Sequence, residues 1–186
     1  MLALIAPTAC GKDTIKKELL ELGFEGVVTT TTRPMRLGEI NGVSYHFVDD
    51  DEFLDMQLNN ELAEHTYYDT VQGRWYYGCQ KKDLENHDHK VIILNPDGIL
   101  SLMKTMNLND WVVFYIDCPE TIMRERLNKR GDKTAEIERR IEADKKDFVN
   151  INRLCDFKIT NDGKETPRDL ARKIMRLYER SISANV

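Results

Sequence analysis

Long apolar runs are missing from this chain of 186 residues. No stretch approaches the roughly 18 consecutive apolar residues that a membrane-spanning helix needs, so we expect no membrane partner. Residues 2–6, which precede the first motif, are too few for a signal peptide, and we therefore expect a cytoplasmic protein.

Cysteine and net positive charge are also scarce. The four cysteines form no C-x-x-C pair and have no histidine at zinc-binding spacing: Cys10, Cys79, Cys118 and Cys155. This pattern favours reduced, mostly buried thiols over a disulfide framework or a zinc site. A formal net charge of -5 argues against a surface that coats nucleic acid, so we expect no nucleic-acid partner.

What the chain does contain is the composition of one soluble domain, with 41% hydrophobic and 32% charged residues. Strand and helix signals alternate, which predicts an α/β fold around a largely parallel sheet. We expect strands at residues 2–6, 91–94, 112–116 and 157–160. The expected helices of the core span residues 12–22, 98–106, 121–129 and 167–180.

Two segments differ from this alternation. Residues 28–80 contain many Thr, Val, Tyr and Phe and one short predicted helix at 50–62, so they read as a small mixed β/α insertion. Residues 124–145 form a charged helical stretch that Gly131-Asp132 interrupts. The predicted single domain therefore has a core at about 1–27, 81–123 and 146–186, with two appended pieces.

A phosphate-binding loop (P-loop) opens the chain at residues 6–14. A short apolar run, a small-residue turn, Gly-Lys and an amphipathic stretch predict strand, loop and helix, with backbone N–H groups and an amine facing one anion. Two positions break the pattern G-x-x-x-x-G-K-[ST]: Ala6 replaces the first Gly and Asp13 replaces Ser or Thr. The alternative is an ordinary strand-to-helix turn. The residues expected to bind ATP are Pro7, Thr8, Ala9, Cys10, Gly11, Lys12, Asp13 and Thr14, and Asp13 is expected to face Mg²⁺, directly or through water.

The insertion contains a second candidate anion site. Arg33 and Arg36 lie three residues apart across a proline, and arginine donates two parallel hydrogen bonds to phosphate oxygens. Tyr45 and Tyr77 add hydroxyl donors. Together these four residues can hold a monophosphate, although the segment alone also fits a solvated loop with scattered arginines.

Here the sequence closely resembles the guanylate kinase family. Residues 28–48 match the family phrase V-S-x-T-T-R-x-P-R-x-G-E-x-x-G-x-x-Y-x-F-V, with Thr29 in place of Ser. Tyr76-Tyr77-Gly78-Cys79 matches Y-Y-G-[ST], residues 126–141 resemble the lid pattern R-L-x-x-R-G…K-R, and Asn161-Asp162 resembles the late N-D. The resemblance covers essentially the whole chain in the right order.

The resemblance implies a P-loop NTPase-type core with a nucleoside-monophosphate-binding insertion (28–80) and a helical lid (124–145). It implies ATP-dependent phosphorylation of GMP or dGMP, with Mg²⁺ accompanying ATP. Arg33, Arg36, Tyr45 and Tyr77 would hold the GMP phosphate. The guanine pocket would consist of Thr29, Glu64, Cys79 and Asp97, because two carboxylates suit the donors of guanine.

Phosphoryl transfer needs alignment and charge neutralisation, and no general base is required when the acceptor is an ionised phosphate. Lys12 is expected to reach the β and γ phosphates. Arg126 and Arg130 are four apart and share a helix face, and the family pattern adds Arg140. Lys12, Arg126, Arg130 and Arg140 are thus the candidate catalytic residues. The alternative for the arginines is a charged solvent face.

Some features depart from the family. Cys79 replaces a hydroxyl, Asn95 replaces the first acid of D-x-D, and about four extra residues lie near 71–74, which can place Arg74 or Trp75 against the substrate. A broader deoxynucleoside monophosphate kinase of phage type therefore stays open. A non-catalytic protein-binding module is a second class, although such modules typically lose the residues corresponding to Lys12, Arg130 and Arg140. We expect a monomer or homodimer.

Overall fold

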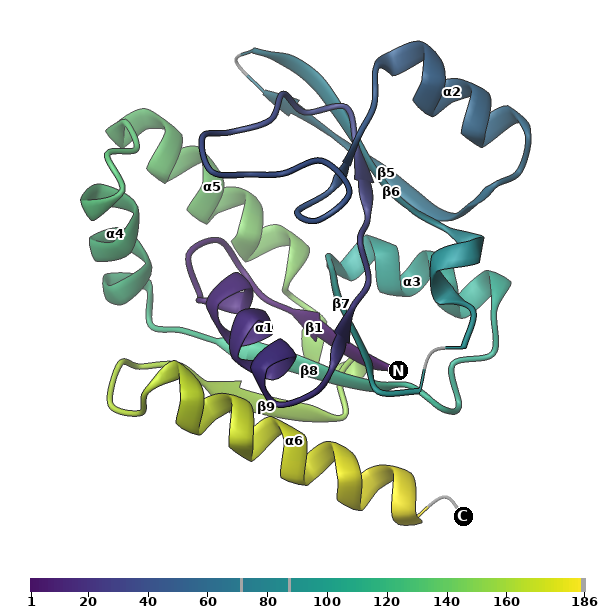
Figure 1. The fold of residues 1–186 in the computed structure, drawn as a ribbon. Coiled ribbons are helices and arrows are strands. Elements are labelled where there is room, and N and C mark those ends of the chain that lie inside the picture. The colour runs from purple at the N-terminus through teal and green to yellow at the C-terminus, as the bar shows by residue number, and fades with distance from the viewer. Residues whose placement is uncertain (71, 87, 185–186) are drawn as a thin grey trace. The chain divides into compact units, whose positions relative to one another are not determined.

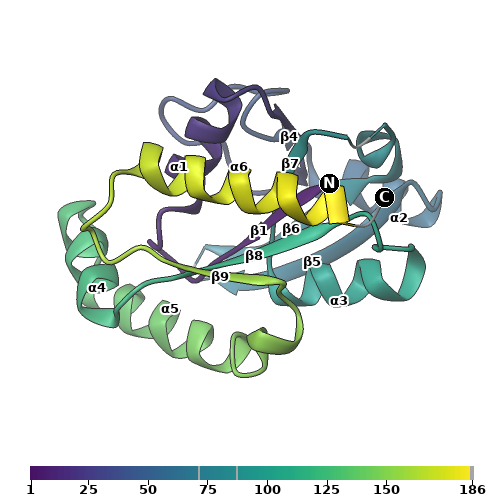
Figure 2. The ribbon, with the colours of Figure 1, turned by 90° about the horizontal axis from the view of Figure 1, so that it is seen from below.

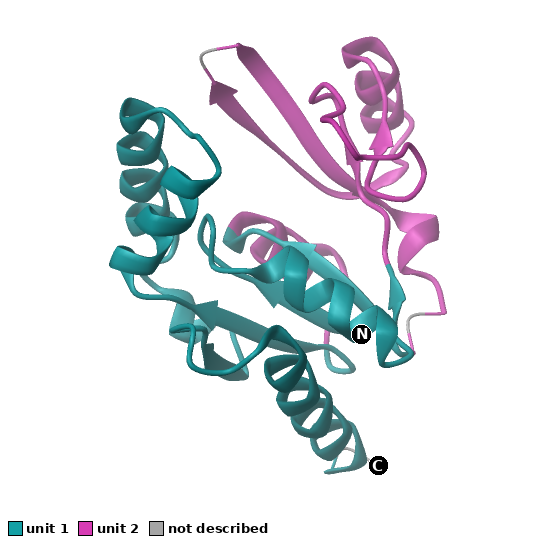
Figure 3. Cartoon of the chain, turned by 60° about the vertical axis from the view of Figure 1, so that its left-hand side comes forward, with its two compact units in different colours: residues 1–26, 89–96, 109–186 teal, residues 27–88, 97–108 magenta. Residues whose placement is uncertain are grey.

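The computed structural model describes residues 1–70, 72–86 and 88–184 and divides into two compact units. Unit 1 comprises residues 1–26, 89–96 and 109–186, and unit 2 comprises residues 27–88 and 97–108 (Figure 3). The predicted boundaries placed 81–123 with the core. In the structure, residues 81–88 and 97–108 group with the insertion instead. At the start of the first segment, the Lys81 N–H donates to the Glu61 carbonyl oxygen at 2.8 Å.

Unit 1 contains a five-stranded parallel sheet in the order β2-β7-β1-β8-β9. Its strands are β1 (Leu2–Ile5), β2 (Glu25–Gly26), β7 (Lys90–Leu94), β8 (Val112–Asp117) and β9 (Phe157–Thr160). The central strands are continuous apolar runs because helices cover both faces of the sheet. The four predicted core strands are confirmed to within one residue at each end, and β2 is an edge strand that the sequence did not indicate.

Helices α1 (Lys12–Glu21) and α6 (Pro167–Ala184) lie on one face of this sheet, and α5 (Thr134–Asp147) lies on the other (Figures 1 and 2). Helix α4 (Glu120–Lys129) precedes α5, and a short turn separates them. The predicted break at Gly131-Asp132 is therefore confirmed. A short 3₁₀ turn, η2 (Ile151–Arg153), leads from α5 into β9.

Unit 2 is built on a four-stranded mixed sheet in the order β4-β3-β6-β5. Strands β3 (Thr30–Thr31) and β4 (His46–Phe47) are parallel, whereas β6 (Gly73–Gln80) is antiparallel to both β3 and β5 (Leu62–Thr70). The unit also contains α2 (Asp50–Leu58), the 3₁₀ turn η1 (Lys81–Leu84) and most of α3 (Pro96–Thr105). The predicted mixed β/α character of residues 28–80 is confirmed.

Three predicted helix ends were wrong. The last helix, expected to end at residue 180, continues to Ala184. The helix expected at 50–62 ends at Leu58, because Asn60 adopts a left-handed backbone with φ of 57° and Leu62 already starts β5. Helix α3 begins at Pro96, two residues before the predicted start, since proline is well accommodated in the first turn of a helix.

Three of the four cysteines are buried, Cys155 is partly buried, and all four are free thiols, as predicted. Among the described residues, no helix is both long and apolar enough to cross a membrane, which agrees with the shortness of the apolar runs.

Candidate nucleotide-binding sites

The P-loop joins β1 to α1 in unit 1. Its backbone turns at two left-handed residues, Ala9 with φ of 55° and Gly11 with φ of 89°. A Cβ atom at Gly11 would lie 2.6 Å from the side-chain nitrogen of Asn161, so glycine is required there by both backbone and space. Ala6, which replaces the first glycine of the motif, does not have a positive φ. Its methyl group is therefore compatible with the turn.

Side chains from other elements hold the carbonyl groups of this loop. Arg126 in α4 donates to the Ala9 carbonyl oxygen at 3.1 Å and to the Asn161 side-chain oxygen at 3.2 Å. Asn161, which directly follows β9, donates to the Cys10 carbonyl oxygen at 2.8 Å. The loop is therefore shaped by contacts to residues more than 100 positions away in sequence.

Five backbone N–H groups of the loop have no protein acceptor among the described residues, whereas the Thr8 and Cys10 N–H groups do. The five belong to Ala9, Gly11, Lys12, Asp13 and Thr14. Several of them also open helix α1, where the helix dipole favours negative charge. This arrangement is suited to bind the phosphates of a nucleotide.

Three of the loop side chains differ in environment. The Cys10 thiol is fully buried, and this burial raises its pKa above its ordinary value, so it packs as a small apolar group. The Lys12 amine lies 3.3 Å from the Asp13 carboxylate, whose side chain is 75% exposed. The Asp13 carboxylate thus lies on the solvent side of the loop, next to the Lys12 amine.

The lid helices bring the predicted catalytic arginines Arg130 and Arg140 to one carboxylate. Arg130 binds Asp132 at 3.0 Å, and Arg140 lies 3.7 Å from the same side chain. Glu136 binds Arg140 at 2.7 Å and Arg139 at 2.8 Å. These arginines, Arg139 foremost, hold the pKa of Glu136 down at about 2.

The alternative reading of the lid as a charged solvent face fits its outer residues. Arg124 in α4 bonds to Glu120 on its own helix and to Glu138 in α5. Lys145 binds Glu120 at 3.2 Å. These exposed pairs join the two helices. Arg126, Arg130 and Arg140 take no part in them: Arg126 binds the P-loop, and Arg130 and Arg140 contact Asp132.

In unit 2, Arg33 forms the centre of the predicted monophosphate site. Its side chain is only 4% exposed and makes two hydrogen bonds with Glu39, at 2.7 and 3.0 Å. The guanidinium lies over the Tyr45 ring, 5.4 Å from its centroid, and that centroid lies 6.3 Å from the centroid of Tyr77. Arg36 is exposed, and its backbone N–H donates to Glu39. The structure therefore brings Arg33 and Arg36 to the Glu39 carboxylate, and it places the Tyr45 and Tyr77 rings beside Arg33 and beside each other.

Three of the four residues of the predicted guanine pocket, Thr29, Glu64 and Cys79, form a row across the sheet. Strand register pairs Glu64 with Cys79 and pairs Thr30 with Gly78, which places Thr29 opposite Cys79. Neighbours across strands share one face of a sheet. Glu64 is buried, and this burial raises the pKa of its carboxyl to about 7, although the Cys79 backbone N–H opposes the rise.

Cys79, Asp97 and Arg74 have different environments. The Cys79 thiol is completely buried and lies 3.7 Å from the Gln80 carbonyl oxygen. Asp97 is exposed in the first turn of α3. Arg74 binds Asp69 at 2.8 Å and stacks on Tyr67 within the same hairpin, so the structure does not free it for a substrate. Val71 of the predicted insertion lies outside the described residues.

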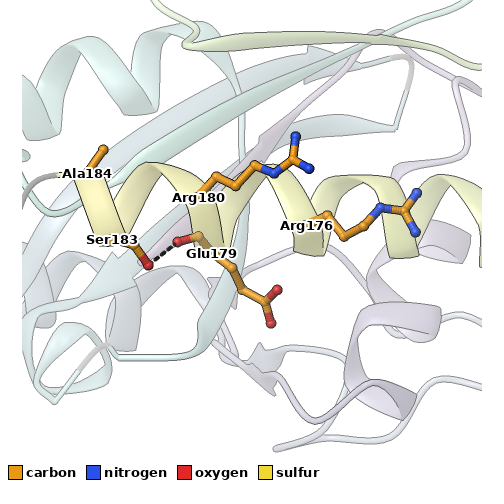
Figure 4. A pocket seen from close by; sticks show the side chains of 5 residues that line it. All are labelled: Arg176, Glu179, Arg180, Ser183 and Ala184. Atoms are coloured by element: carbon orange, nitrogen blue, oxygen red, sulfur yellow. Dashed lines mark hydrogen bonds between the residues drawn. The ribbon is translucent and has the colours of Figure 1, made fainter.

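A separate pocket lies on the C-terminal part of α6 (Figure 4). Its lining residues all belong to that one helix: Arg176, Glu179, Arg180, Ser183 and Ala184. The Ser183 hydroxyl donates to the Glu179 carbonyl oxygen at 2.8 Å, which is a bond within the helix. None of the predicted nucleotide-binding residues lines this pocket.

Comparison with known proteins decides the family. The family model described as guanylate kinase matches residues 1–176. The chain belongs to the guanylate kinase family. The resemblance proposed from the motifs is thereby confirmed.

Individual guanylate kinases support this membership. The chain is 30% identical over 184 residues to the guanylate kinase of Anaplasma phagocytophilum, covering 95% of this chain and 85% of that protein. It is 32% identical to the guanylate kinase of Maricaulis maris, covering 96% and 80%. The crystal structure of the Anaplasma guanylate kinase superposes with a TM-score of 0.74 at 26% identity, covering 97% of this chain and 84% of that chain.

Within this guanylate kinase fold, several residues contact predicted site residues although sequence reasoning gave them no site role: Glu39, Asp132, Glu136, Asp144 and Asn161. Glu39 and Asn161 stand inside the motifs that carry the family resemblance, which was one available signal. A different feature of the sequence could have identified Asp144. This residue follows the buried Ile137 and Ile141 at helical spacing, so a carboxylate interrupts the apolar stripe of α5.

Proposed function

We propose that this chain transfers the γ-phosphoryl group of ATP to GMP or dGMP and releases ADP and the nucleoside diphosphate. The observation that carries the proposal is the row of Thr29, Cys79 and buried Glu64, in the same unit as Arg33, Tyr45 and Tyr77. An ionised carboxylate there accepts hydrogen bonds from the N1–H and amine of guanine. Adenine presents an acceptor at N1, which gives that carboxylate no proton to share.

The phosphate of GMP would be held by the arginine and tyrosine group. Arg33 already has one carboxylate partner in Glu39, which fixes its guanidinium plane. Its remaining N–H groups, the exposed Arg36 and the hydroxyls of Tyr45 and Tyr77 would then bind phosphate oxygens. Asp97 would assist Glu64 at the base.

The triphosphate would lie against the free N–H groups of the P-loop, with Lys12 on the β and γ phosphates. Arg130 and Arg140 would neutralise the charge that develops on the transferring group. Arg126 supports this site through its bonds to Ala9 and Asn161. No general base is needed, since the acceptor is an ionised phosphate.

Mg²⁺ bound with ATP fits this loop. Asp13 offers one exposed carboxylate, and the described residues contain no group of three or more acidic, His or Cys side chains that could cage a metal. Magnesium typically takes one or two carboxylates and completes its shell with phosphates and water. When bound, the ion would neutralise phosphate charge, while Asp13 would orient it.

The test is a coupled assay of ADP formation with GMP, dGMP, AMP, CMP, UMP and dTMP as acceptors. We expect turnover with GMP and dGMP. Absence of turnover with every acceptor would overturn the kinase proposal. Equal turnover of AMP and GMP would overturn the guanine assignment, and turnover spread over the deoxynucleotides would identify the broader kinase instead.

A further inference from the structure

We propose that Asp144 is a positioning residue of the ATP site, which ties lid helix α5 to the P-loop and takes up a proton when the triphosphate binds. The inference rests on the proposed function only in assuming that the loop binds a nucleoside triphosphate. It assigns a role to a residue that no motif of the chain includes.

The geometry places this carboxylate among the phosphate donors. The Thr8 backbone N–H donates to an Asp144 oxygen at 2.8 Å, from a loop position directly before the unbonded N–H of Ala9. The Asp144 carboxylate therefore accepts from one N–H group of a loop in which five other N–H groups have no acceptor among the described residues. Helix α5 and the P-loop are joined by this bond across 136 positions of sequence.

The charges around Asp144 make this position sensitive to a bound polyphosphate. The charged or titratable groups that face it come from the loop, from β8 and from α5: Lys12, Cys10, Tyr115, Arg139, Arg140 and Asp147. Lys12 and the Thr8 N–H favour the ionised carboxylate, whereas burial opposes it. Burial dominates and raises the pKa of Asp144 to about 6.

A triphosphate adds several negative charges beside this side chain. A neighbouring like charge disfavours the ionised form of a carboxylic acid. Because the pKa of Asp144 is already raised, binding of ATP shifts it further upward, and the protein gains a proton near neutral pH. Affinity for ATP then falls as pH rises from 6 to 8, since the proton becomes scarcer.

Two variants distinguish the effect of the negative charge of Asp144 from the effect of its hydrogen bond to Thr8. Asp144→Asn keeps an oxygen that can accept the Thr8 N–H and removes the negative charge. Glu142→Gln removes one charge from the exposed face of the same helix, where Glu142 binds Lys145. If the proposal is correct, Asp144→Asn binds ATP–Mg²⁺ about tenfold more tightly than the natural chain at pH 8 and equally at pH 5.5, whereas Glu142→Gln behaves as the natural chain.

The experiment is titration calorimetry of ATP–Mg²⁺ binding to the full chain at pH 7 in buffers of different ionisation enthalpy. Uptake of a proton by the natural chain and Glu142→Gln, and its loss in Asp144→Asn, is the expected result. Equal proton uptake in all three proteins, or weaker binding of Asp144→Asn at pH 8, would overturn the proposal.

A nucleotide-free measurement distinguishes failure of this inference from failure of the proposed function. The Thr8 amide resonance should titrate with a midpoint near pH 6 in the natural chain and stay constant in Asp144→Asn. A Thr8 amide that does not titrate in the natural chain refutes the contact itself, whatever the chain phosphorylates. The acceptor assay tests the kinase activity separately.

Discussion

At the scale of single residues, the protonation state of Glu64 links the sheet of unit 2 to substrate choice. Its pKa of about 7 follows from burial in the row with Cys79 and Thr29. Only the ionised carboxylate accepts hydrogen bonds from both donors of guanine. Because of its raised pKa, Glu64, which recognises the base in the proposed function, is about half-protonated at neutral pH.

We expect the KM for GMP to rise about tenfold per pH unit below pH 7, because binding must first remove the Glu64 proton. Glu64→Gln should weaken GMP binding and lose this part of the pH profile, and the profile is measured by initial rates from pH 5.5 to 8.5. The second ionisation of the GMP phosphate, near pH 6 by analogy with other phosphate monoesters, is common to both proteins and cancels in the comparison. Glu61→Gln, an exposed neighbour, serves as the control. An unchanged profile in Glu64→Gln would exclude Glu64 from the base pocket.

Gly11 is the second residue for which the structure predicts the effect of a substitution on nucleotide binding. Gly11→Ala adds a methyl group 2.6 Å from the Asn161 side-chain nitrogen at a φ of 89°. The loop or Asn161 must move, and the bond from Asn161 to the Cys10 carbonyl is then lost. ATP binding should fall at least 100-fold, because that bond helps to shape the phosphate cradle, while GMP binding stays unchanged.

Equilibrium binding of each nucleotide alone checks this expectation. Gly163→Ala is the matched control, since Gly163 also has a positive φ of 84° but a methyl group there would have no atom within 4 Å. If both glycine variants weakened ATP equally, backbone strain alone would explain the loss and Asn161 would have no part in it.

At the scale of elements, the turn between α4 and α5 holds the side chains of two lid arginines, Arg130 and Arg140. Asp132 lies in this turn, is 15% exposed, and contacts Arg130 from α4 and Arg140 from α5. A carboxylate between two arginines keeps them close together in the absence of a phosphate. The family pattern identified the arginines, and the structure adds the group that connects them.

Asp132→Asn should lower kcat about tenfold and leave both KM values within twofold, because the arginines act mainly on the charge that develops during transfer. Steady-state kinetics at saturating ATP and GMP measure this split. Glu125→Gln, an exposed substitution on α4, should leave kcat unchanged. A rise in the KM for ATP without loss of kcat would instead assign Asp132 to nucleotide binding.

At the scale of the whole molecule, the two units contain the residues of different proposed sites. The P-loop and the lid helices α4 and α5 belong to unit 1, whereas the arginine and tyrosine group and the Glu64 row belong to unit 2. Each nucleotide should therefore stabilise the unit that holds its own donors.

Amide hydrogen exchange tests whether each nucleotide binds to its own unit. ATP–Mg²⁺ alone should slow amide exchange in residues 7–14 and 126–147, and GMP alone should slow it in residues 29–47 and 64–79. A ligand at 100 times its dissociation constant stabilises the bound form by about 2.7 kcal/mol, which sets the scale of protection. Lys12→Ala should abolish the first effect and spare the second. Protection of the P-loop by GMP alone would contradict the assignment of the two sites.

Much of this organisation was predictable from local pattern. The strand, loop and helix of residues 2–22, the buried runs of β7 and β8 and the break between α4 and α5 all follow from apolar periodicity and turn residues. The long β5–β6 hairpin was not predicted, because Tyr, Thr and charged residues alternate there without a clear apolar face.

By itself the sequence determined the family, the order of its elements and the residue types available to bind phosphate and base, because motif spacing and periodicity are properties of neighbouring residues. Only the tertiary structure decided which partner each charged side chain takes. Glu39 on Arg33, Asp132 between two arginines, Asn161 on Cys10 and Asp144 on Thr8 depend on how the chain folds back on itself. An arginine or carboxylate can pair with any opposite charge within reach, and reach is set by folding.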